Sequence, residues 1–273
     1  GYTYANFISL AKQLNIRLIP IEGDADGMLP HALAQQHHQI NIKGVYLMPS
    51  CANPTGIVMP EERRREIAAV LCKHNMLLIE DDAYGFTARE NAVPMTVLLP
   101  RQSIYLHSLS KLTCPGLRVA YMLVPAHFRQ LIRRAARSLS MAIPPLSAEI
   151  ASELIESGAA EHIMREKCRM SEDRNRIFQG IFPAHTGNTR SFFQWMPLPV
   201  GCGGANFEAQ AQHRGVCVLS SDHFAVGSEE EYSFIRLALC SPPTNEELAC
   251  GLRIVHDLME ENTIPPQTDT LIL

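Results

Sequence analysis

The 273-residue sequence has no long hydrophobic segment and no block of like charge. A membrane-spanning helix needs roughly 18 to 20 consecutive apolar residues, and no run approaches that length. The first residues lack the basic and apolar parts of a secretory signal peptide. The 24 basic and 28 acidic side chains are interspersed and leave a net charge of −4, which disfavours a surface for nucleic acid or anionic lipid. We therefore expect a cytoplasmic protein, in which this segment contacts neither membranes nor nucleic acid.

Short-range metal-ligand motifs are also missing. The eight cysteines include no Cys-x-x-Cys pair, and no His-Glu-x-x-His motif occurs, although zinc sites favour such spacings. We interpret the cysteines as reduced, small hydrophobic residues and expect no metal site. Asp24-Ala25-Asp26-Gly27 resembles the start of a calcium loop, but the twelfth position is Gln35 instead of glutamate. A turn is the preferred interpretation of that segment.

Apolar periodicity alternates between helix and strand in the first half of the sequence. Helical spacing predicts helices near 7–14, 31–38 and 61–74. Short apolar runs predict strands at 16–21, 45–48, 76–79, 104–106 and 117–124. Strands that are apolar on both faces and alternate with helices favour a mostly parallel sheet covered by helices. The predicted fold class is therefore α/β.

The second half is predicted to contain a helical stretch and then a smaller α+β unit. Helical patterns dominate 126–182, and Ile143-Pro144-Pro145 should end one helix and begin the next. Strands are expected at 192–196, 216–219 and 234–239, with helices at 205–213 and 245–259. We predict a large domain at 1–165, a small C-terminal domain at 166–262 and a frayed tail at 263–273.

Four short motifs lie in loops directly after a predicted strand or at the end of one, where open α/β sheets bind ligands. They are Asn53-Pro54-Thr55-Gly56, Asp81-Asp82-Ala83-Tyr84-Gly85, Ser108-Leu109-Ser110-Lys111 and Pro115-Gly116-Leu117-Arg118. Singly, each has another explanation: the first is a good turn, and the two aspartates suit Mg²⁺ or a solvated strand end. Ser108 and Lys111 also match the Ser-x-x-Lys pattern of serine acyl-enzymes, but the Ser-Asp-Asn and Lys-Thr-Gly elements of that class do not occur in the sequence.

Together and in this order, the four motifs resemble the active site of the fold-type I, pyridoxal-phosphate-dependent aminotransferases of class I and II. Ser233-Phe234-Ile235-Arg236-Leu237 is similar to the carboxylate-binding arginine strand of that family, so the resemblance covers nearly the whole chain. The segments 80–82 and 193–199 look closest to a subgroup shared by free-standing aminotransferases and the C-terminal domains of GntR/MocR-type regulators. The resemblance implies a large cofactor-binding domain, a smaller C-terminal domain and a homodimer.

The resemblance also implies pyridoxal 5′-phosphate as the cofactor and a role for each matching residue. Lys111 would form the Schiff base and move a proton of the substrate, and Asp81 would face the pyridinium nitrogen. Asn53 and Tyr84 would hydrogen-bond the phenolic oxygen of the cofactor, and Asn53 would also border the substrate. The phosphate would be held by Ser108, Ser110 and Arg118. Arg236 would bind the substrate α-carboxylate.

Two of these assignments have a physical argument beside the resemblance. A lysine transfers protons near neutral pH only if burial or nearby positive charge lowers its pKa, and Arg118 is a suitable neighbour for Lys111. Asp81 is preferred to Asp82 because the family places this carboxylate three residues before the tyrosine, here Tyr84. Asp82 is expected to point away and serve structure.

The sequence starts later than the family pattern does. In the family, an N-terminal arm, an aromatic ring that stacks on the cofactor and further phosphate-binding amides precede the position of Gly1. We therefore expect an N-terminally truncated domain that binds the cofactor weakly or not at all. The predicted function is transfer of an amino group between an α-amino acid and a 2-oxo acid. A non-catalytic, effector-sensing domain of a GntR/MocR-type regulator and a structural remnant without a ligand are the alternatives.

Overall fold

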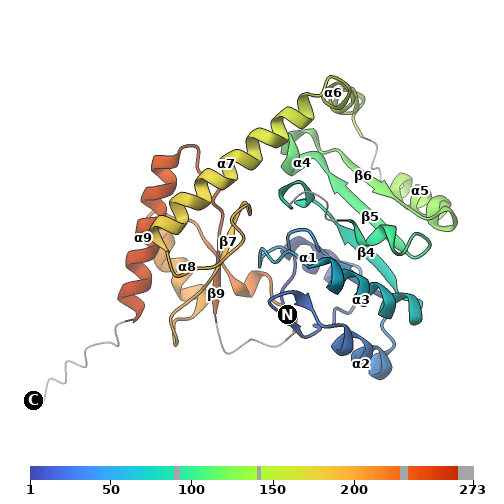
Figure 1. Cartoon of the computed structure of the whole chain (residues 1–273), viewed down its shortest axis with the longest axis horizontal. Coiled ribbons are helices and arrows are strands. Elements are labelled where there is room, and N and C mark those ends of the chain that lie inside the picture. Colours follow the sequence, from blue (N-terminus) through green and yellow to red (C-terminus); the bar gives the residue numbers. More distant parts are fainter. Residues whose placement is uncertain (89–92, 140–142, 228–232, 264–273) are drawn as a thin grey trace, which may run out of the picture. The chain divides into compact units, whose positions relative to one another are not determined.

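A four-stranded and a three-stranded sheet form the framework of the structure, a computed structural model that describes residues 1–88, 93–139, 143–227 and 233–263 (Figure 1). The chain divides into two units. The first contains Gly1 and 20–170, and the second contains 2–19 and the described residues from 171 onward. The predicted division assigned 2–19 to the large domain, whereas the structure groups this segment with the second unit. No helix in the described ranges has the length and apolar content needed to cross a bilayer.

The sheet of the first unit is mostly parallel, which confirms the predicted α/β class (Figure 1). Its strands follow the order β3 (Gly44–Leu47), β4 (Leu77–Asp81), β5 (Ser103–Ser108) and β6 (Ala120–Leu123). β3, β4 and β5 are parallel, and β6 is antiparallel to β5. Because the three parallel strands are neighbours, the loops after their carboxyl ends emerge at one edge of the sheet.

Amphipathic helices complete the first unit. They are α2 (Pro30–Ile40), α3 (Glu61–Lys73), α4 (Leu109–Leu112), α5 (Arg129–Ser138), α6 (Pro145–Glu156) and the first part of α7 (Ala159–Ile181). α3 starts after Pro60, with glutamates in its first turn and a lysine in its last turn, as the helix dipole favours. Its apolar face joins a core that contains Leu33, Ile67, Leu71, Met76 and Leu78. Full burial of each such side chain is worth about 1.5–3 kcal/mol.

The second unit packs helices on an antiparallel sheet. The strands follow the order β7 (Gln194–Pro197), β9 (Phe234–Leu237) and β8 (Leu219–Ser220). The helices are α1 (Ala5–Gln13), the second part of α7, α8 (Gly204–His213) and α9 (Asn245–Thr263). Tyr2 explains why the N-terminal segment belongs here, since its ring lies 5.1 Å from the Trp195 ring and 6.0 Å from the Phe234 ring.

Three predicted strands differ most from the structure. Residues 16–21 form no strand, because Asn15 ends the preceding helix with φ +54° and no described neighbouring strand pairs with the apolar run that follows. The strand expected at 117–124 covers only 120–123, because residues 115–117 form a 3₁₀ turn. The strand expected at 216–219 is reduced to Leu219–Ser220. The tail predicted from 263 lies outside the described residues beyond Thr263.

The segment 24–27 is a turn, as preferred from its sequence. It joins β1 (Gly23–Asp24) to β2 (Gly27–Met28), and the Asp26 amide donates to Asp24 Oδ1 at 2.9 Å. Gly27 has φ +97°, a conformation that L side chains rarely adopt. Asp24 also accepts hydrogen bonds from both terminal nitrogens of Arg63 at 2.9 Å, so its carboxylate connects the turn to α3.

Candidate active site

The loop after β3 holds Asn53 through hydrogen bonds near both of its ends. The Met59 amide donates to Pro49 O at 2.8 Å, and the Ala52 amide donates to Ile57 O at 2.9 Å. Gly56, with φ +73°, allows the tight reversal between them. Asn53 is buried, and its Oδ1 has no hydrogen-bond partner among the described residues. Since the O and N of an amide can exchange places by a flip, this side chain can accept from or donate to a ligand.

A buried arginine, which the sequence did not single out, clamps this loop. Arg64 of α3 is 2% exposed. Its guanidinium donates to Met59 O at 2.9 Å, to Pro49 O at 3.0 Å and to Val93 O at 3.0 Å. Burial lowers the pKa of Arg64, and the nearby carboxylates Glu80 and Asp82 oppose that effect. Arg64 therefore fixes both ends of the segment that carries Asn53.

Asp81 ends β4 with hydrogen bonds to both carboxylate oxygens. Tyr46 Oη of β3 donates to its Oδ2 at 2.5 Å, and the Ala83 amide donates to its Oδ1 at 3.1 Å. Burial raises the pKa of Asp81 and the charge of Asp82 adds to that rise, while the Tyr46 and Ala83 hydrogen bonds lower it. The side chain is half-buried, so the remaining lone pairs of the carboxylate can accept from a ligand.

Asp82 has a different environment. Its side chain is buried, and Oδ2 accepts from Tyr105 Oη of β5 at 2.5 Å. A Cβ atom added at Gly85 would collide with the Asp82 carboxylate, so this glycine makes the room for it. Oδ1 is buried without a hydrogen-bond partner among the described residues. The expected structural role of Asp82 stays a prediction, and these contacts give it a physical basis.

Lys111 lies in the short helix α4 directly after β5. Ser108 caps this helix, and its hydroxyl oxygen accepts from the Ser110 amide at 3.2 Å. The Lys111 side chain is exposed, with Nζ 5.9 Å from the centroid of the Tyr84 ring, which is itself buried. Lys167 Nζ of α7 donates to the carbonyl oxygens of Lys111 at 2.9 Å and Thr113 at 2.6 Å. The structure therefore brings the amine and the phenol of two predicted site residues together.

Arg118 lies just before β6, and its side chain is exposed. The Leu109 amide donates to Val119 O at 3.1 Å, and Ser108 pairs with Ala120 in the β5–β6 register. Arg118 adopts φ +55°. Apart from glycines, the other residues with positive φ in the described chain are all asparagines. A left-handed arginine is uncommon and marks a position that its surroundings hold in place.

Known proteins that resemble this chain show the family to which it belongs. The sequence model of the family described as aminotransferase class I and II matches residues 1–252. The chain belongs to this family. It is 33% identical over 264 residues to YdeF, an uncharacterized HTH-type transcriptional regulator of Bacillus subtilis strain 168, a match that covers 96% of this chain and 57% of YdeF. It is 26% identical over 241 residues to the 2-aminoadipate transaminase of Thermus thermophilus, covering 84% of this chain and 61% of that enzyme.

Solved aminotransferases share the fold. An archaeal alanine:glyoxylate aminotransferase superimposes with a TM-score of 0.87 at 24% identity, over 95% of this chain and 67% of that chain. LysN, the α-aminoadipate aminotransferase of Thermus thermophilus, was solved with N-(5′-phosphopyridoxyl)-L-leucine and gives a TM-score of 0.85 at 24% identity, over 95% of this chain and 69% of that chain. The predicted family and fold type are confirmed. This aminotransferase-type domain spans less than two thirds of YdeF and of the 2-aminoadipate transaminase.

Arg236 belongs to the second unit of the aminotransferase-type domain. It lies on β9, paired in register with Trp195 of β7 and Leu219 of β8. Its guanidinium carbon lies 4.3 Å from the Phe193 ring centroid and 6.0 Å from that of Phe224. Cation–π contacts of this kind hold a half-buried guanidinium in one orientation. Arg236 is therefore half-buried and not a fully exposed strand residue, and its expected carboxylate-binding role stays a prediction.

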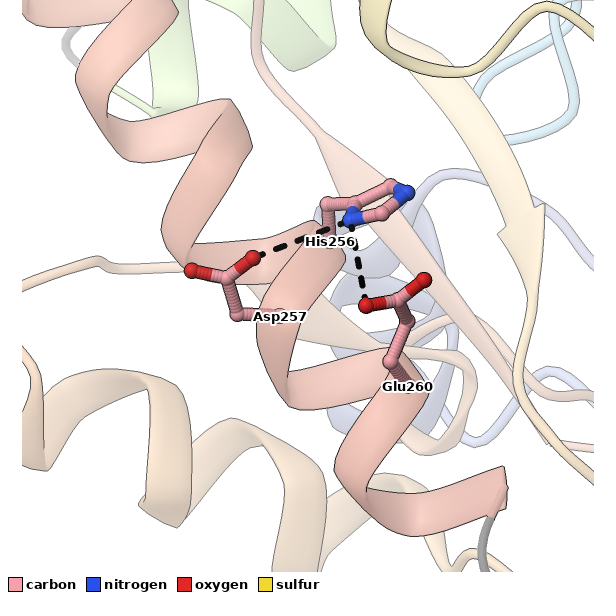
Figure 2. Close-up of side chains that lie close together, drawn as sticks. All are labelled: His256, Asp257 and Glu260. Atoms are coloured by element: carbon pink, nitrogen blue, oxygen red, sulfur yellow. Dashed lines mark ion pairs between the residues drawn. The ribbon is translucent and has the colours of Figure 1, made fainter.

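One cluster of potential metal ligands occurs within the described residues, on α9 (Figure 2). His256 Nδ1 lies 3.7 Å from Asp257 Oδ1 and 4.0 Å from Glu260 Oε2. Both carboxylates are exposed, and side chains four positions apart on a helix, such as His256 and Glu260, lie close together without an ion. We interpret the cluster as surface ion pairs, and the expectation of no metal site stays a prediction.

Proposed function

We propose that the edge of the first sheet binds pyridoxal 5′-phosphate and that the protein transfers an amino group between an α-amino acid and a 2-oxo acid. The observation that supports this most is the grouping of three motifs after β3, β4 and β5, which are adjacent and parallel. They supply an amide, a carboxylate and an amine, the groups that the cofactor requires around its ring. The buried, partnerless Oδ1 of Asn53 supports a ligand at this edge.

Each residue has a chemical task in this proposal. Lys111 would hold the cofactor through its amine and, once the amine of the substrate has displaced it, would move the proton released at the substrate Cα. Asp81 pairs with the ring nitrogen, and Asn53 and Tyr84 bind the phenolic oxygen. The phosphate is bound by Ser108, Ser110 and Arg118. When bound, the cofactor supplies an electron sink for the electron pair left at the substrate Cα.

Arg236 completes the proposal on the substrate side. A guanidinium binds a carboxylate through two parallel hydrogen bonds, which fix the orientation of the substrate as well as its position. Orientation matters because the way in which the substrate is held would decide which of its Cα bonds breaks. The aromatic contacts of Phe193 and Phe224 support a preorganised guanidinium.

The decisive experiment is covalent trapping. The chain is mixed with pyridoxal phosphate, reduced with borohydride and digested, and the labelled peptide is identified by mass spectrometry. The label is expected on Lys111 and is expected to disappear in K111A, while K73A, which removes an exposed lysine from the end of α3, keeps it. A label on another lysine, or none, contradicts the proposed function.

A sensing role in a transcriptional regulator is the second candidate. The observation that favours it is the 33% identity to the HTH-type regulator YdeF over 96% of this chain. In such a protein the same site would bind cofactor and an amino-acid effector, and the output would be a conformational change. Binding of amino acids without release of a 2-oxo acid would favour the sensor.

We also propose the homodimer that the family resemblance implies, and light scattering of the purified chain tests it.

A further inference from the structure

Two tyrosine–aspartate pairs flank the carboxyl end of β4. Tyr46 of β3 donates to Asp81, and Tyr105 of β5 donates to Asp82, each with an Oη–Oδ2 distance of 2.5 Å. Neither tyrosine belongs to the motifs that resemble the aminotransferase site. The two pairs have the same chemistry and the same Oη–Oδ2 distance, so Tyr105 is a matched control for Tyr46.

The strand register places the two pairs on opposite faces of the sheet. Tyr46 pairs with Ile79, which lies on the same face of β4 as Asp81 because side chains alternate along a strand. Tyr105 pairs with Glu80, which shares its face with Asp82. The two tyrosines therefore reach neighbouring aspartates from different sides.

The face of Glu80 and Asp82 is filled by the protein. Glu80 has no exposed surface, and its carboxylate accepts from the Met95 amide at 2.9 Å and the Thr96 amide at 2.7 Å. The carboxylate of Asp82 is packed against Gly85. Asp81, on the other face, is half-buried. Of the two aspartates, Asp81 has the surroundings that leave room for a ligand.

We propose that Tyr46 is a positioning residue that holds the Asp81 carboxylate for the ring nitrogen of the cofactor, and that Tyr105 has no such role because it holds Asp82. This inference rests on the proposed function. Donation from a phenol fixes one orientation of the carboxylate and favours its ionised form. An ionised carboxylate is the form that pairs with a protonated ring nitrogen.

Removal of the phenol should act on the cofactor through Asp81. Burial and the charge of Asp82 raise the pKa of Asp81, and the Tyr46 hydrogen bond opposes them. In Y46F the carboxylate loses that donor, so its pKa rises further and its charge is lost at a higher pH. The lower pH limit of cofactor binding is expected to move upward in Y46F and to stay in place in Y105F.

The test measures the dissociation constant of pyridoxal phosphate by absorbance titration of the full chain from pH 5 to pH 8. Y46F is expected to weaken binding by up to about 10-fold at neutral pH, because the Tyr46 bond to Asp81 exists with and without the cofactor and only its effect on the orientation and charge of the carboxylate is lost. Y105F is expected to change it less than about 2-fold. Thermal unfolding of both variants without cofactor controls for general damage, since each loses one part-buried phenol hydrogen bond.

A double-mutant cycle separates positioning from stability. In the D81N background, Y46F is expected to add little further loss of affinity, because the group on which it acts is gone. Equal or larger weakening in Y105F, or additive effects of Y46F and D81N, overturns the inference while Lys111 is still labelled in the unmodified chain. If the unmodified chain shows no label at Lys111, the proposed function fails, and the inference fails with it.

Discussion

At the scale of single residues, Arg64 carries the clearest stability prediction. Its guanidinium satisfies three backbone carbonyls in a buried setting, so R64A leaves buried acceptors without donors. Each unsatisfied group costs about 1–3 kcal/mol. We expect R64A to lower the free energy of unfolding in urea by about 3 kcal/mol, a sum below the maximum because water can reach some of the freed carbonyls.

The adjacent arginine is a matched control for this measurement. Arg65 lies one residue further on the same helix, and its guanidinium forms an exposed ion pair with Glu61. R65A should change the free energy of unfolding by less than about 1 kcal/mol. Equal losses of unfolding free energy in R64A and R65A would mean that the hydrogen bonds of Arg64 to the loop make no specific contribution to stability.

Some residues of the candidate site could be predicted from short sequence motifs, and others could not. Asn53, Asp81, Lys111 and Arg118 stand in short motifs, and the structure places their motifs at one sheet edge as expected. Tyr46 was not found because its partner lies 35 residues away in the chain, and a tyrosine in a strand has no local signature. Such partners become visible only when the strand register is known. Arg64 had one usable signal, its position on the apolar face of α3 with Ile67, Ala68 and Leu71.

At the scale of elements, the turn after β4 depends on a missing side chain. A Cβ atom at Gly85 would collide with the Asp82 carboxylate, and this turn carries the buried Tyr84. G85A should lower the free energy of unfolding by about 1–3 kcal/mol, as overpacking does. We also expect weaker cofactor binding, because Tyr84 is displaced.

Gly180 gives the control for the substitution at position 85. It lies in α7, where an added Cβ atom meets nothing within 4 Å. G180A should raise the free energy of unfolding by about 0.5–1 kcal/mol, since alanine is the better helix former. Urea denaturation of both variants checks the opposite signs, and a stabilised G85A would contradict the proposed close approach.

A cluster of three histidines lies at the ends of two helices and is expected to make the stability of the protein depend on pH. His37 in the last turn of α2 lies 4.6 Å, ring to ring, from His74, which follows α3, and the His38 ring lies 5.2 Å from the His74 ring. Desolvation lowers the pKa of His74, and the charges of His37, His38 and Lys73 lower it further. His37 Nδ1 lies 3.2 Å from Ile42 O, a contact that orients the ring.

The sign of the pH effect follows from that lowered pKa. Below the ordinary histidine value near 6.5, the unfolded chain binds a proton at His74 that the folded protein resists, so stability is lost as the pH falls through this range. Thermal unfolding should therefore shift to lower temperature between pH 7.5 and pH 5.5. H74Q should flatten this dependence, whereas H162Q, which removes an exposed histidine of α7, should leave it unchanged.

At the scale of the whole molecule, the class of fold was predictable and the membership of its units was not. Alternating periodicity gives the mostly parallel sheet, because both faces of such strands are covered by helices. The assignment of 2–19 to the second unit agrees with the contacts of Tyr2 with Trp195 and Phe234, which lie far apart in the sequence and leave no trace in periodicity. Long-range aromatic contacts therefore limit what a single sequence reveals.

Arg236 gives a prediction that separates substrate binding from cofactor binding across the whole protein. Its guanidinium is proposed to bind the substrate carboxylate and makes no proposed contact with the cofactor. R236Q should therefore raise the KM for amino acids by about 10-fold or more, at a cost of about 1.5–3 kcal/mol for a charge-assisted bond, and leave the dissociation constant of pyridoxal phosphate unchanged. R253Q, which alters an exposed arginine on α9, should change neither quantity. If the chain binds amino acids without turnover, the same comparison made on amino-acid affinity still tests Arg236, and only an unchanged affinity in R236Q excludes the proposed contact.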